Sequence, residues 1–600
     1  MLSPYFKSIK IIFYIYYTYN TFFAIIIQER MIKMWMKYLK PYRKQAIIGF
    51  LFKLIEAFFD LIVPIVVADI IDYGIAAKDQ QYILHKGILL FILAISGYSC
   101  ALVCQYFASK TSQGFGTYLR NDMFKAINAY DYENIDKIGI PSLMTRITND
   151  TNQLQLAVAM TIRLASRSPF LIIGSLIMAF RINVSMSLIF ICAAPLLALS
   201  IYLVMSRSLP LYLKIQKQLD YVSLICRENL AGIRVIRAFS KQNQEKERFH
   251  QATQKQKDMQ MRVGKLSALL NPSTSVIVNC AILMILYVGS LKVNSGTLLQ
   301  GEVIALINYM NQILLSMFAF ANVIVIYNKA TACYKRVKEV LSIQPVIQDG
   351  LQKMDHHEGA LVTFDHVSFS YQGSHALSDL SFSIEKGETV GIIGGTGSGK
   401  STLVNLIPRF YEASQGQIYI KDRPIQNYSL QSLRQMIGFV PQQALLFTGT
   451  IKDNICFGKE DASDDEIIEA LNLAQASFVK EWKDGIYSHI TQGGHNLSGG
   501  QKQRLTIARA LVRNPELLIL DDSASALDFA TDAALRKAIA SLPQTTIIVS
   551  QRVSAIMHAD KILVLSHGEL VGIGKHDELL KNCEIYQQIV HSQLSKEVAS

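Results

Sequence analysis

The stretch Gly394-Gly395-Thr396-Gly397-Ser398-Gly399-Lys400-Ser401 matches the pattern G-x-x-x-x-G-K-[ST] at every fixed position. It follows an apolar, β-like run at residues 389–393 and leads into a helix-like run at residues 402–407. This order predicts a phosphate-binding loop, because glycines let successive backbone N–H groups converge on phosphate oxygens. Lys400 would supply positive charge to the phosphates, and the Ser401 hydroxyl would be a ligand for Mg²⁺. The alternative, a plain glycine-rich turn, does not account for the complete motif.

The composition of the whole chain indicates a membrane protein with more than one domain. The chain has 600 residues, of which 50% are hydrophobic and only 18% charged. The net charge of +12 does not predict nucleic-acid binding, because the positive residues fall mostly in stretches expected on one side of a membrane. The eight cysteines are scattered without a C-x-x-C pair, as expected for reduced thiols.

Six long apolar segments precede the phosphate loop, and each is long enough to cross a bilayer as a helix. Their approximate limits are 45–71, 83–108, 158–180, 183–205, 272–291 and 302–327. Lys and Arg concentrate after the second and the fourth segments, which predicts that both ends of this region are cytoplasmic. Those two stretches are too long for ordinary loops, so we expect helices that extend into the cytosol and turn back near residues 128–134 and 228–237.

Some ionisable residues fall inside the apolar segments. Glu56 and Asp60 share one helix face in the first segment, and Arg163 and Arg167 do so in the third. Charges at membrane depth usually face a cavity or a partner. Two interpretations stay open for these residues: a polar pathway for a transported compound, in which Arg167 is the better candidate, or interfacial charges and structural ion pairs.

The expected fold is an all-α transmembrane domain of six helices followed by an α/β P-loop ATPase domain. The predicted division of the chain is an N-terminal extension, a transmembrane domain with cytosolic helical extensions, a linker, a nucleotide-binding domain and a C-terminal tail, at residues 1–30, 31–330, 331–358, 359–585 and 586–600. The extension is expected to be non-essential or to precede the true start of translation.

A second motif, Leu497-Ser498-Gly499-Gly500-Gln501, lies downstream of the phosphate loop. With it, the region from about 360 to 585 resembles the ATPase domain of ABC transporters, and the six-segment region resembles the exporter type. The resemblance implies that the chain is half of a transporter. It also implies that Ser498, Gly499, Gly500 and Gln501 contact the γ-phosphate of ATP held by the other ATPase domain.

The resemblance also assigns the remaining site residues. Tyr371 matches the aromatic residue that stacks on adenine, and Gln442 matches the glutamine that touches Mg²⁺ or the attacking water. Asp521, at the end of an apolar run, would hold Mg²⁺ through water. The implied cofactors are ATP and Mg²⁺, with metal contacts from Ser401, Gln442 and Asp521. The implied ATP contacts come from Tyr371, Gly394, Gly395, Thr396, Gly397, Ser398, Gly399, Lys400, Ser401, Thr402, Ser498, Gly499, Gly500, Gln501 and Asp528.

Two positions depart from the family pattern, and both belong to its catalytic group together with Gln442. Asp522 stands where a glutamate is expected as general base, and it is shorter by one methylene, roughly 1.5 Å of reach. Gln551 stands where a histidine is expected against the γ-phosphate, and glutamine cannot carry charge. Losing one well-placed stabiliser costs on the order of 10²–10³ in rate. The pair predicts a site that binds ATP and hydrolyses it slowly.

These features predict one subunit of a heterodimeric ABC exporter in a bacterial plasma membrane, with an amphipathic small molecule as cargo. The second half-transporter subunit would supply the competent site, and the lipid bilayer is the other expected partner. Two alternatives remain open: a slow, homodimeric lipid flippase, and a regulatory or channel-like protein gated by ATP.

Overall fold

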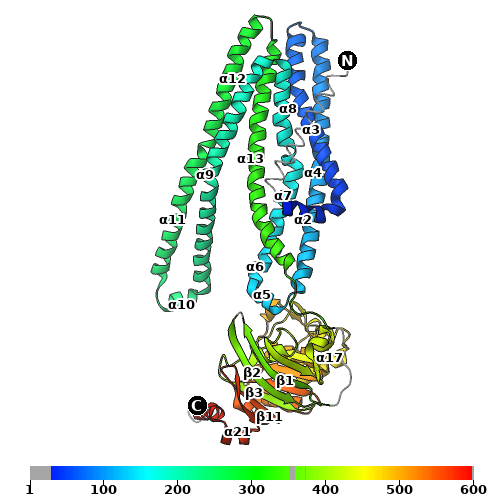
Figure 1. Ribbon diagram of the computed structural model, residues 1–600, viewed down its shortest axis with the longest axis vertical. Helices are drawn as coiled ribbons and strands as arrows, with labels where there is room; N and C mark the ends of the chain where they lie inside the picture. Colours follow the sequence, from blue (N-terminus) through cyan, green and yellow to red (C-terminus); the bar gives the residue numbers. More distant parts are fainter. Residues whose placement is uncertain (1–28, 351–358, 372, 598–600) are drawn as a thin grey trace. The chain divides into compact units, whose positions relative to one another are not determined.

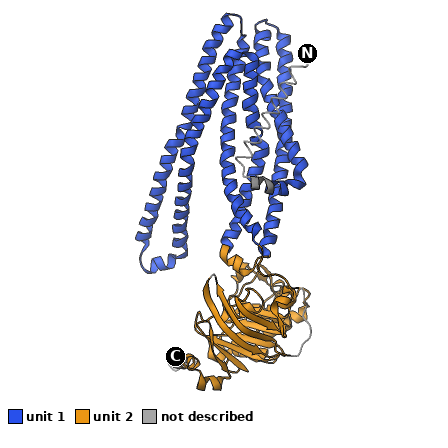
Figure 2. Cartoon of the chain, in the orientation of Figure 1, with its two compact units in different colours: residues 1–128, 139–343 blue, residues 129–138, 344–600 orange. Residues whose placement is uncertain are grey.

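The computed structural model describes residues 29–350, 359–371 and 373–597. The chain divides into two compact units (Figure 2), one with residues up to 128 and 139–343, the other with residues 129–138 and 344 onward. The predicted N-terminal extension lies outside the described residues, except for its last two, which begin helix α2 (Glu29–Leu39).

The first unit is built from helices (Figure 1), several of them more than 40 residues long. After α2 come α3 (Arg43–Asp69), α4 (Gln80–Asn128), α6 (Ile140–Thr145), α7 (Thr151–Met160), α8 (Arg167–Ile182), α9 (Val184–Ala231), α10 (Ile233–Ala238), α11 (Gln242–Ala268), α12 (Leu270–Asn294) and α13 (Gln300–Ser342). The 3₁₀ turn η1 (Lys40–Tyr42) precedes α3, and the π-helical turns η2 (Ile70–Ile75), η3 (Arg146–Asp150) and η4 (Thr161–Ala165) follow α3, α6 and α7.

Five helical stretches in the described part of the chain are long and apolar enough to cross a membrane by length and composition. They are Gln80–Asn128, Ile140–Ile182, Val184–Ala231, Gln242–Asn294 and Gln300–Ser342. The remaining predicted segment, residues 45–71, forms α3 and the start of η2. It is absent from this set because Lys53, Glu56 and Asp60 interrupt its apolar sequence. The predicted fold class, a helical transmembrane domain before an α/β domain, is confirmed.

Three charges in the interior of α3, those of Lys53, Glu56 and Asp60, are paired within the unit. Arg167 Nη2 lies 2.6 Å from Asp60 Oδ2 and 3.9 Å from Glu56 Oε1. Lys53 Nζ lies 2.8 Å from both carboxylate oxygens of Glu56, which is buried. A buried carboxylate needs such partners, because leaving it unpaired is costly. These ion pairs tie α3 to α8, and a role for Arg167 in a transport pathway stays a prediction.

A proline explains how α3 is tied to α13. Pro64 lies inside α3 and has no N–H, so the carbonyl of Asp60 loses its helical donor. Gln312 on α13 donates from Nε2 to that carbonyl at 2.8 Å, and the buried Tyr309 hydroxyl donates to the Leu61 carbonyl at 2.6 Å. Side chains of α13 thus satisfy backbone oxygens of α3.

The predicted hairpin tips coincide with short helices. The first tip includes α5 (Tyr132–Ile138), which belongs to the second unit, and the second includes α10. Between α9 and α11 the buried residues Val222, Ile225 and Ala252 form a small apolar cluster. The α9–α11 pair diverges from α13 toward its tip, so its sides stand apart from the rest of the unit (Figure 1).

The second unit is α/β (Figure 1). Its strands are β1 (Val362–Tyr371), β2 (Ser374–Ile384), β3 (Thr389–Gly394), β4 (Gln415–Ile420), β5 (Arg423–Pro424), β6 (Ile437–Val440), β7 (Gly449–Thr450), β8 (His489–Ile490), β9 (Leu517–Asp521), β10 (Thr545–Val549), β11 (Lys561–Ser566) and β12 (Glu569–Gly574). The order β12-β11-β3-β10-β9-β6 forms a sheet that is parallel except for β12, and β2-β1-β4-β5 forms an antiparallel one.

Register in the parallel sheet decides where the site lies. Val549 at the end of β10 pairs with Ile392 on β3 and with Asp521 at the end of β9. The carboxyl ends of these strands therefore meet at one edge, where α/β sheets bind their ligands. The buried, largely apolar runs of β3, β9 and β10 form the centre of this sheet, as expected of strands covered on both faces.

Helices cover the sheets. They are α14 (Lys400–Leu406), α15 (Leu430–Gln435), α16 (Ile451–Cys456), α17 (Asp464–Leu473), α18 (Phe478–Glu481), α19 (Gly499–Leu511), α20 (Phe529–Ala540), α21 (His576–Asn582) and α22 (Glu584–Glu597), with 3₁₀ turns η5 (Ile425–Asn427), η6 (Gly485–Tyr487), η7 (Gln492–Gly494) and η8 (Val553–Ala555). One apolar cluster joins the antiparallel sheet to β3 and α14, and another joins β6 and β9 to α16, α17 and α19.

Two predicted boundaries differ from the structure. The stretch 331–358 was expected to be a linker, yet α13 continues to Ser342, because Cys333, Val337 and Val340 follow a helical spacing and are buried. The tail from residue 586 was expected to lie outside the nucleotide-binding domain. It forms most of α22, whose Tyr586 and Val590 are buried against η8 and β11.

Candidate nucleotide-binding site

The phosphate loop has the predicted strand–loop–helix context, since β3 ends at Gly394 and α14 begins at Lys400. Gly397 and Gly399 have φ angles of 79° and 95°, which side chains rarely adopt. At Gly399 an added Cβ would lie 2.7 Å from Leu377 Cδ2 and 2.8 Å from the Ala376 carbonyl oxygen. Both conformation and space therefore require glycine at this position.

Lys400 is the cation of the loop. Its Nζ donates to the carbonyls of Gly394 and Gly395, both at 2.8 Å, and lies 3.5 Å from Ser398 Oγ. Burial lowers the pKa of Lys400, and the charges of Asp522 and Asp521 oppose that effect. A buried ammonium held by neutral oxygens is a strong site for an anion, because a phosphate supplies the charge that the carbonyls lack.

Ser401 and Asp521 form a pair of oxygen ligands. The Ser401 hydroxyl donates to Asp521 Oδ1 at 3.0 Å, and burial raises the pKa of Asp521 while this hydrogen bond lowers it. Hydroxyl and carboxylate oxygens suit Mg²⁺, which takes its other ligands from phosphates and water. Among the described residues, no group of three or more His, Cys, Asp or Glu could hold a metal ion. The residues fit MgATP, in which the metal would neutralise phosphate charge.

The loop opens onto a pocket of about 360 Å³. Its lining joins most of the predicted site: Tyr371, residues 396–402, Gln442, Asp521, Asp522 and Gln551. His375, Ala376 and Val549 also line it and were not predicted. No motif marks these three; His375 reaches the pocket only because it pairs with Ser370 in the β1–β2 register.

Tyr371 lies at the end of β1, on the wall of this pocket. Its ring meets the edge of Tyr411 at 5.2 Å between centroids, and its hydroxyl lies 3.4 Å from Thr402 Oγ1. An aromatic ring held by neighbours at a pocket wall presents a surface on which a flat base can stack. Adenine stacking by Tyr371 stays a prediction that this placement favours.

The two residues that depart from the family pattern lie on the same pocket wall. Asp522 follows β9 in a left-handed conformation, with φ of 44°, and burial raises the pKa of its carboxyl. Its Oδ2 lies 3.4 Å from Gln442 Nε2, which is longer than a good hydrogen bond. Gln551 lies two residues after β10 and is exposed to the pocket.

The second motif lies elsewhere on the unit. Ser498 caps α19: its Oγ accepts from the Gln501 N–H at 3.3 Å, and Gln501 Oε1 accepts from the Ser498 N–H at 2.9 Å. Ser498 and Gly499 are exposed, and neither they nor Asp528 line the pocket. Asp528 caps α20 by accepting from Thr531. This separation is what the resemblance implies for residues that serve another subunit's ATP.

Tyr411 links the Tyr371 wall of the pocket to the first hairpin tip. The Tyr411 hydroxyl donates to Asp136 Oδ2 on α5 at 2.7 Å, while the Tyr411 ring touches Tyr371. Tyr132 on α5 packs on Phe410, with ring centroids 4.8 Å apart. Burial and the Asp136 carboxylate both raise the pKa of Tyr411, so the hydroxyl stays a donor. The helix α5 thus lies one side chain away from Tyr371.

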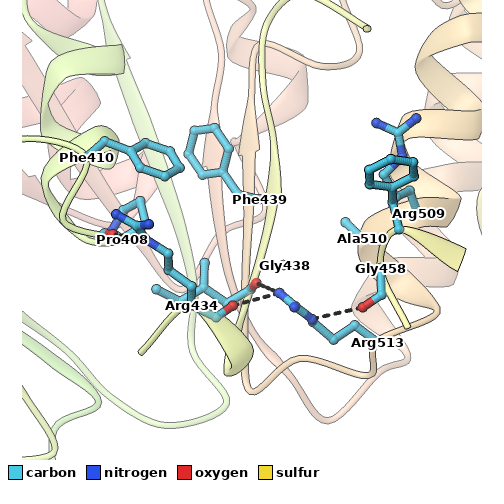
Figure 3. Close-up of a pocket in the computed structure, with 11 residues that line it drawn as sticks. Pro408, Phe410, Arg434, Gly438, Phe439, Gly458, Arg509, Ala510 and Arg513 are labelled. Carbon is cyan, nitrogen blue, oxygen red and sulfur yellow. Dashed lines mark hydrogen bonds between the residues drawn. The ribbon is translucent and has the colours of Figure 1, made fainter. Parts of the chain in front are cut away.

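A second pocket, of about 190 Å³, is lined by aromatic and arginine side chains (Figure 3). Arg513 donates to the carbonyls of Gly458, Arg434 and Ile437 at 3.1, 2.7 and 3.3 Å. Arg509 is held by carbonyls too, and burial lowers its pKa to about 10. The pocket adjoins the α5 contact, because Phe410 lines it and also meets Tyr132.

A helical membrane domain fused to a P-loop ATPase domain defines an ATP-driven membrane transporter. Family models for the ABC transporter transmembrane region and for the ABC transporter ATPase match residues 46–317 and 377–525. The chain belongs to the ABC transporter family, in its exporter arrangement.

Full-length relatives support this assignment. YfiB of Bacillus subtilis, described as an uncharacterized ABC transporter ATP-binding protein, is 38% identical over 94% of this chain and 98% of its own length. YheI of the same organism, a probable multidrug resistance ABC transporter ATP-binding/permease protein, is 37% identical over 74% of this chain and 77% of its own. A bacterial Atm1-family ABC exporter with ATP bound has the same fold, with a TM-score of 0.78, 23% identity, and coverage of 92% of this chain and 99% of that one.

Proposed function

We propose that this chain is one subunit of a heterodimeric ABC exporter in a plasma membrane, and that its own ATP site hydrolyses slowly. The established part is the family's ATP-driven transport. The proposal adds the asymmetry: a second subunit carries glutamate and histidine at the positions of Asp522 and Gln551. The second subunit hydrolyses the ATP bound to its own phosphate loop, which this chain's exposed Ser498 would contact.

One observation carries the proposal: the binding groups are complete where the hydrolytic groups are altered. The residues that would hold MgATP are present: Lys400 lies in the phosphate loop, and the Ser401 hydroxyl donates to Asp521. Asp522 and Gln551 face the same pocket from adjacent strands. A short carboxylate and an uncharged amide in place of a base and an imidazole weaken hydrolysis without removing a binding contact.

The proposed cargo is amphipathic and drug-like or lipid-like. The relative YheI, a probable multidrug resistance ABC transporter, supports a cargo of this kind. The predominantly apolar membrane helices, which carry the few paired charges of Lys53, Glu56, Asp60 and Arg167, suit a compound with an apolar body. Movement of the two tips would transmit nucleotide state to the membrane helices. The first tip would act through α5, which the Tyr411 hydroxyl contacts at Asp136.

The test is to express the chain alone and together with the product of an adjacent transporter gene, and to measure complex size and ATP hydrolysis. We expect low activity from the chain alone and at least 10-fold more from the pair, because one competent base restores turnover. High activity from the chain alone contradicts the proposal. A homodimer of this chain with slow turnover, which the second chain neither joins nor activates, favours the lipid flippase. ATP-gated flux without hydrolysis in proteoliposomes favours the channel-like alternative.

A further inference from the structure

The last described helix, α22, packs against the segment that follows Gln551. Tyr586 is fully buried and Val590 is nearly so, in a cluster that includes Val553, Ala555 and Ile556. The Tyr586 hydroxyl also pairs with His576 Nδ1 on α21 at 2.7 Å. These contacts anchor α22 on the nucleotide-binding unit directly behind η8.

A single side chain of α22 holds the Gln551 loop by both ends. Gln593 Oε1 accepts from the Val553 N–H at 2.9 Å, and Gln593 Nε2 donates to the Gln551 carbonyl at 2.7 Å. The intervening turn is closed by the Arg552 N–H, which donates to Ser550 Oγ at 3.0 Å. The Ser550 N–H continues the sheet through the Ile392 carbonyl. The amide of Gln593 therefore acts as a two-point clamp on the backbone at residues 551–553.

This clamp fixes the residue whose side chain reaches the nucleotide pocket. Gln551 lies after the end of β10, so its backbone is no longer held by strand pairing. Glutamine has several rotatable side-chain bonds, so its amide is already costly to hold in one place. If the backbone at residue 551 could also rotate, the amide would spend less time in the pocket. A fixed carbonyl and a fixed N–H two residues later restrict that motion.

We propose that Gln593 is a positioning residue that orients Gln551 toward the terminal phosphate of ATP, so that the C-terminal helix sets how well this site tells ATP from ADP. The idea rests on the role of Gln551 in the proposed function. Gln593 touches no substrate in this arrangement and acts through the backbone of residue 551.

The experiment uses the full chain with its partner subunit and compares Gln593→Ala with Gln588→Ala. Gln588 is the matched control, since it is an exposed glutamine of the same helix whose amide donates to Glu584 at 3.2 Å. Photolabelling of this chain by 8-azido-ATP, competed by ATP or ADP, reports its own site. Amide hydrogen exchange at Val553, without nucleotide, reports the clamp itself. Thermal unfolding checks that α22 remains folded.

We expect Gln593→Ala to lower the ATP-over-ADP preference roughly 2- to 10-fold and to speed exchange at Val553 by a similar factor, the range of a net hydrogen bond. In a Gln551→Ala background the same change should add nothing to the nucleotide preference. Full additivity of the two changes, or a Gln593→Ala variant that behaves like Gln588→Ala, overturns the inference while leaving the proposed function intact. If Gln551→Ala alone leaves the preference unchanged, the role proposed for Gln551 fails, and the inference fails with it.

Discussion

Restoring the two altered residues should convert the weak site into a hydrolytic one. The perturbation is the double substitution Asp522→Glu and Gln551→His, with each single change alongside. Both side chains line the same pocket and come from adjacent strands, so the new glutamate and histidine would lie within reach of one substrate. The surrounding binding groups, Lys400 and Asp521, are left as they are.

The structure sets the expected magnitude. Asp522 Oδ2 lies 3.4 Å from Gln442 Nε2, and one more methylene extends the carboxylate by roughly 1.5 Å. A general base in reach of its water contributes about 10² to 10⁴ in rate, and one well-placed charge stabiliser about 10² to 10³. Because the present residues retain part of each effect, we expect about 10-fold from Asp522→Glu and at least 10²-fold from the pair. That is roughly 2.7 kcal/mol of barrier.

The assay must report this chain's site apart from its partner's. Trapping with vanadate and 8-azido-ATP labels the subunit whose site hydrolyses, and the two chains separate on a gel. The native complex should carry label on the partner, and the double variant should carry it on both chains. Adding Lys400→Ala to the double variant should remove the new label, and Asp465→Glu on the exposed first turn of α17 is the neutral control.

An unlabelled double variant that still binds ATP would refute the reasoning, because it would show that hydrolysis is limited by something other than residues 522 and 551. The reasoning would also be refuted if the unmodified chain trapped nucleotide with the same efficiency as its partner subunit. The two results differ in their starting activity, so they cannot be confused.

Three further outcomes follow from the same geometry. Lys400→Ala should weaken ATP binding at this site about 10- to 100-fold, as fluorescent-nucleotide titration would show, because a charge-assisted contact contributes about 1.5 to 3 kcal/mol. Tyr411→Phe keeps the ring but removes the hydroxyl donated to Asp136, so α5 should exchange amide hydrogens several-fold faster while ATP affinity stays near native. Arg336→Met leaves the buried Asp150 without its two guanidinium hydrogen bonds, at 2.7 and 2.5 Å, and should lower the unfolding free energy by about 2 to 4 kcal/mol. Thermal unfolding in detergent measures this loss, and Asp150→Asn added to Arg336→Met should recover part of it.

The phosphate loop could be predicted from the sequence because its motif consists of residues that its backbone conformation requires. The phosphate loop demands glycine at a left-handed position, and Gly399 shows why, with Leu377 and the Ala376 carbonyl closing on the place of a side chain. Prediction from sequence was less complete where long-range contacts decide. His375 enters the pocket through strand register, and Gln312 satisfies a carbonyl freed by Pro64, 248 positions earlier in the chain. No local pattern in the sequence carries such pairings.

The contacts of Gln593 with residues 551 and 553 belong to the same class, because a pattern local to the C-terminal tail does not indicate a partner 40 positions earlier.

The register of the sheet also explains how binding and hydrolysis could separate in one site. Lys400 and Ser401 come from the loop and helix after β3, whereas Asp522 and Gln551 follow β9 and β10, which pair directly with each other. The two altered residues thus leave the sheet side by side, in one local environment. The phosphate cradle on the other side of β10 keeps its own contacts. A single substitution in this pocket could be neutral drift. Two neighbouring substitutions beside an unchanged phosphate loop instead favour a site that binds ATP, while the other subunit's site carries out hydrolysis.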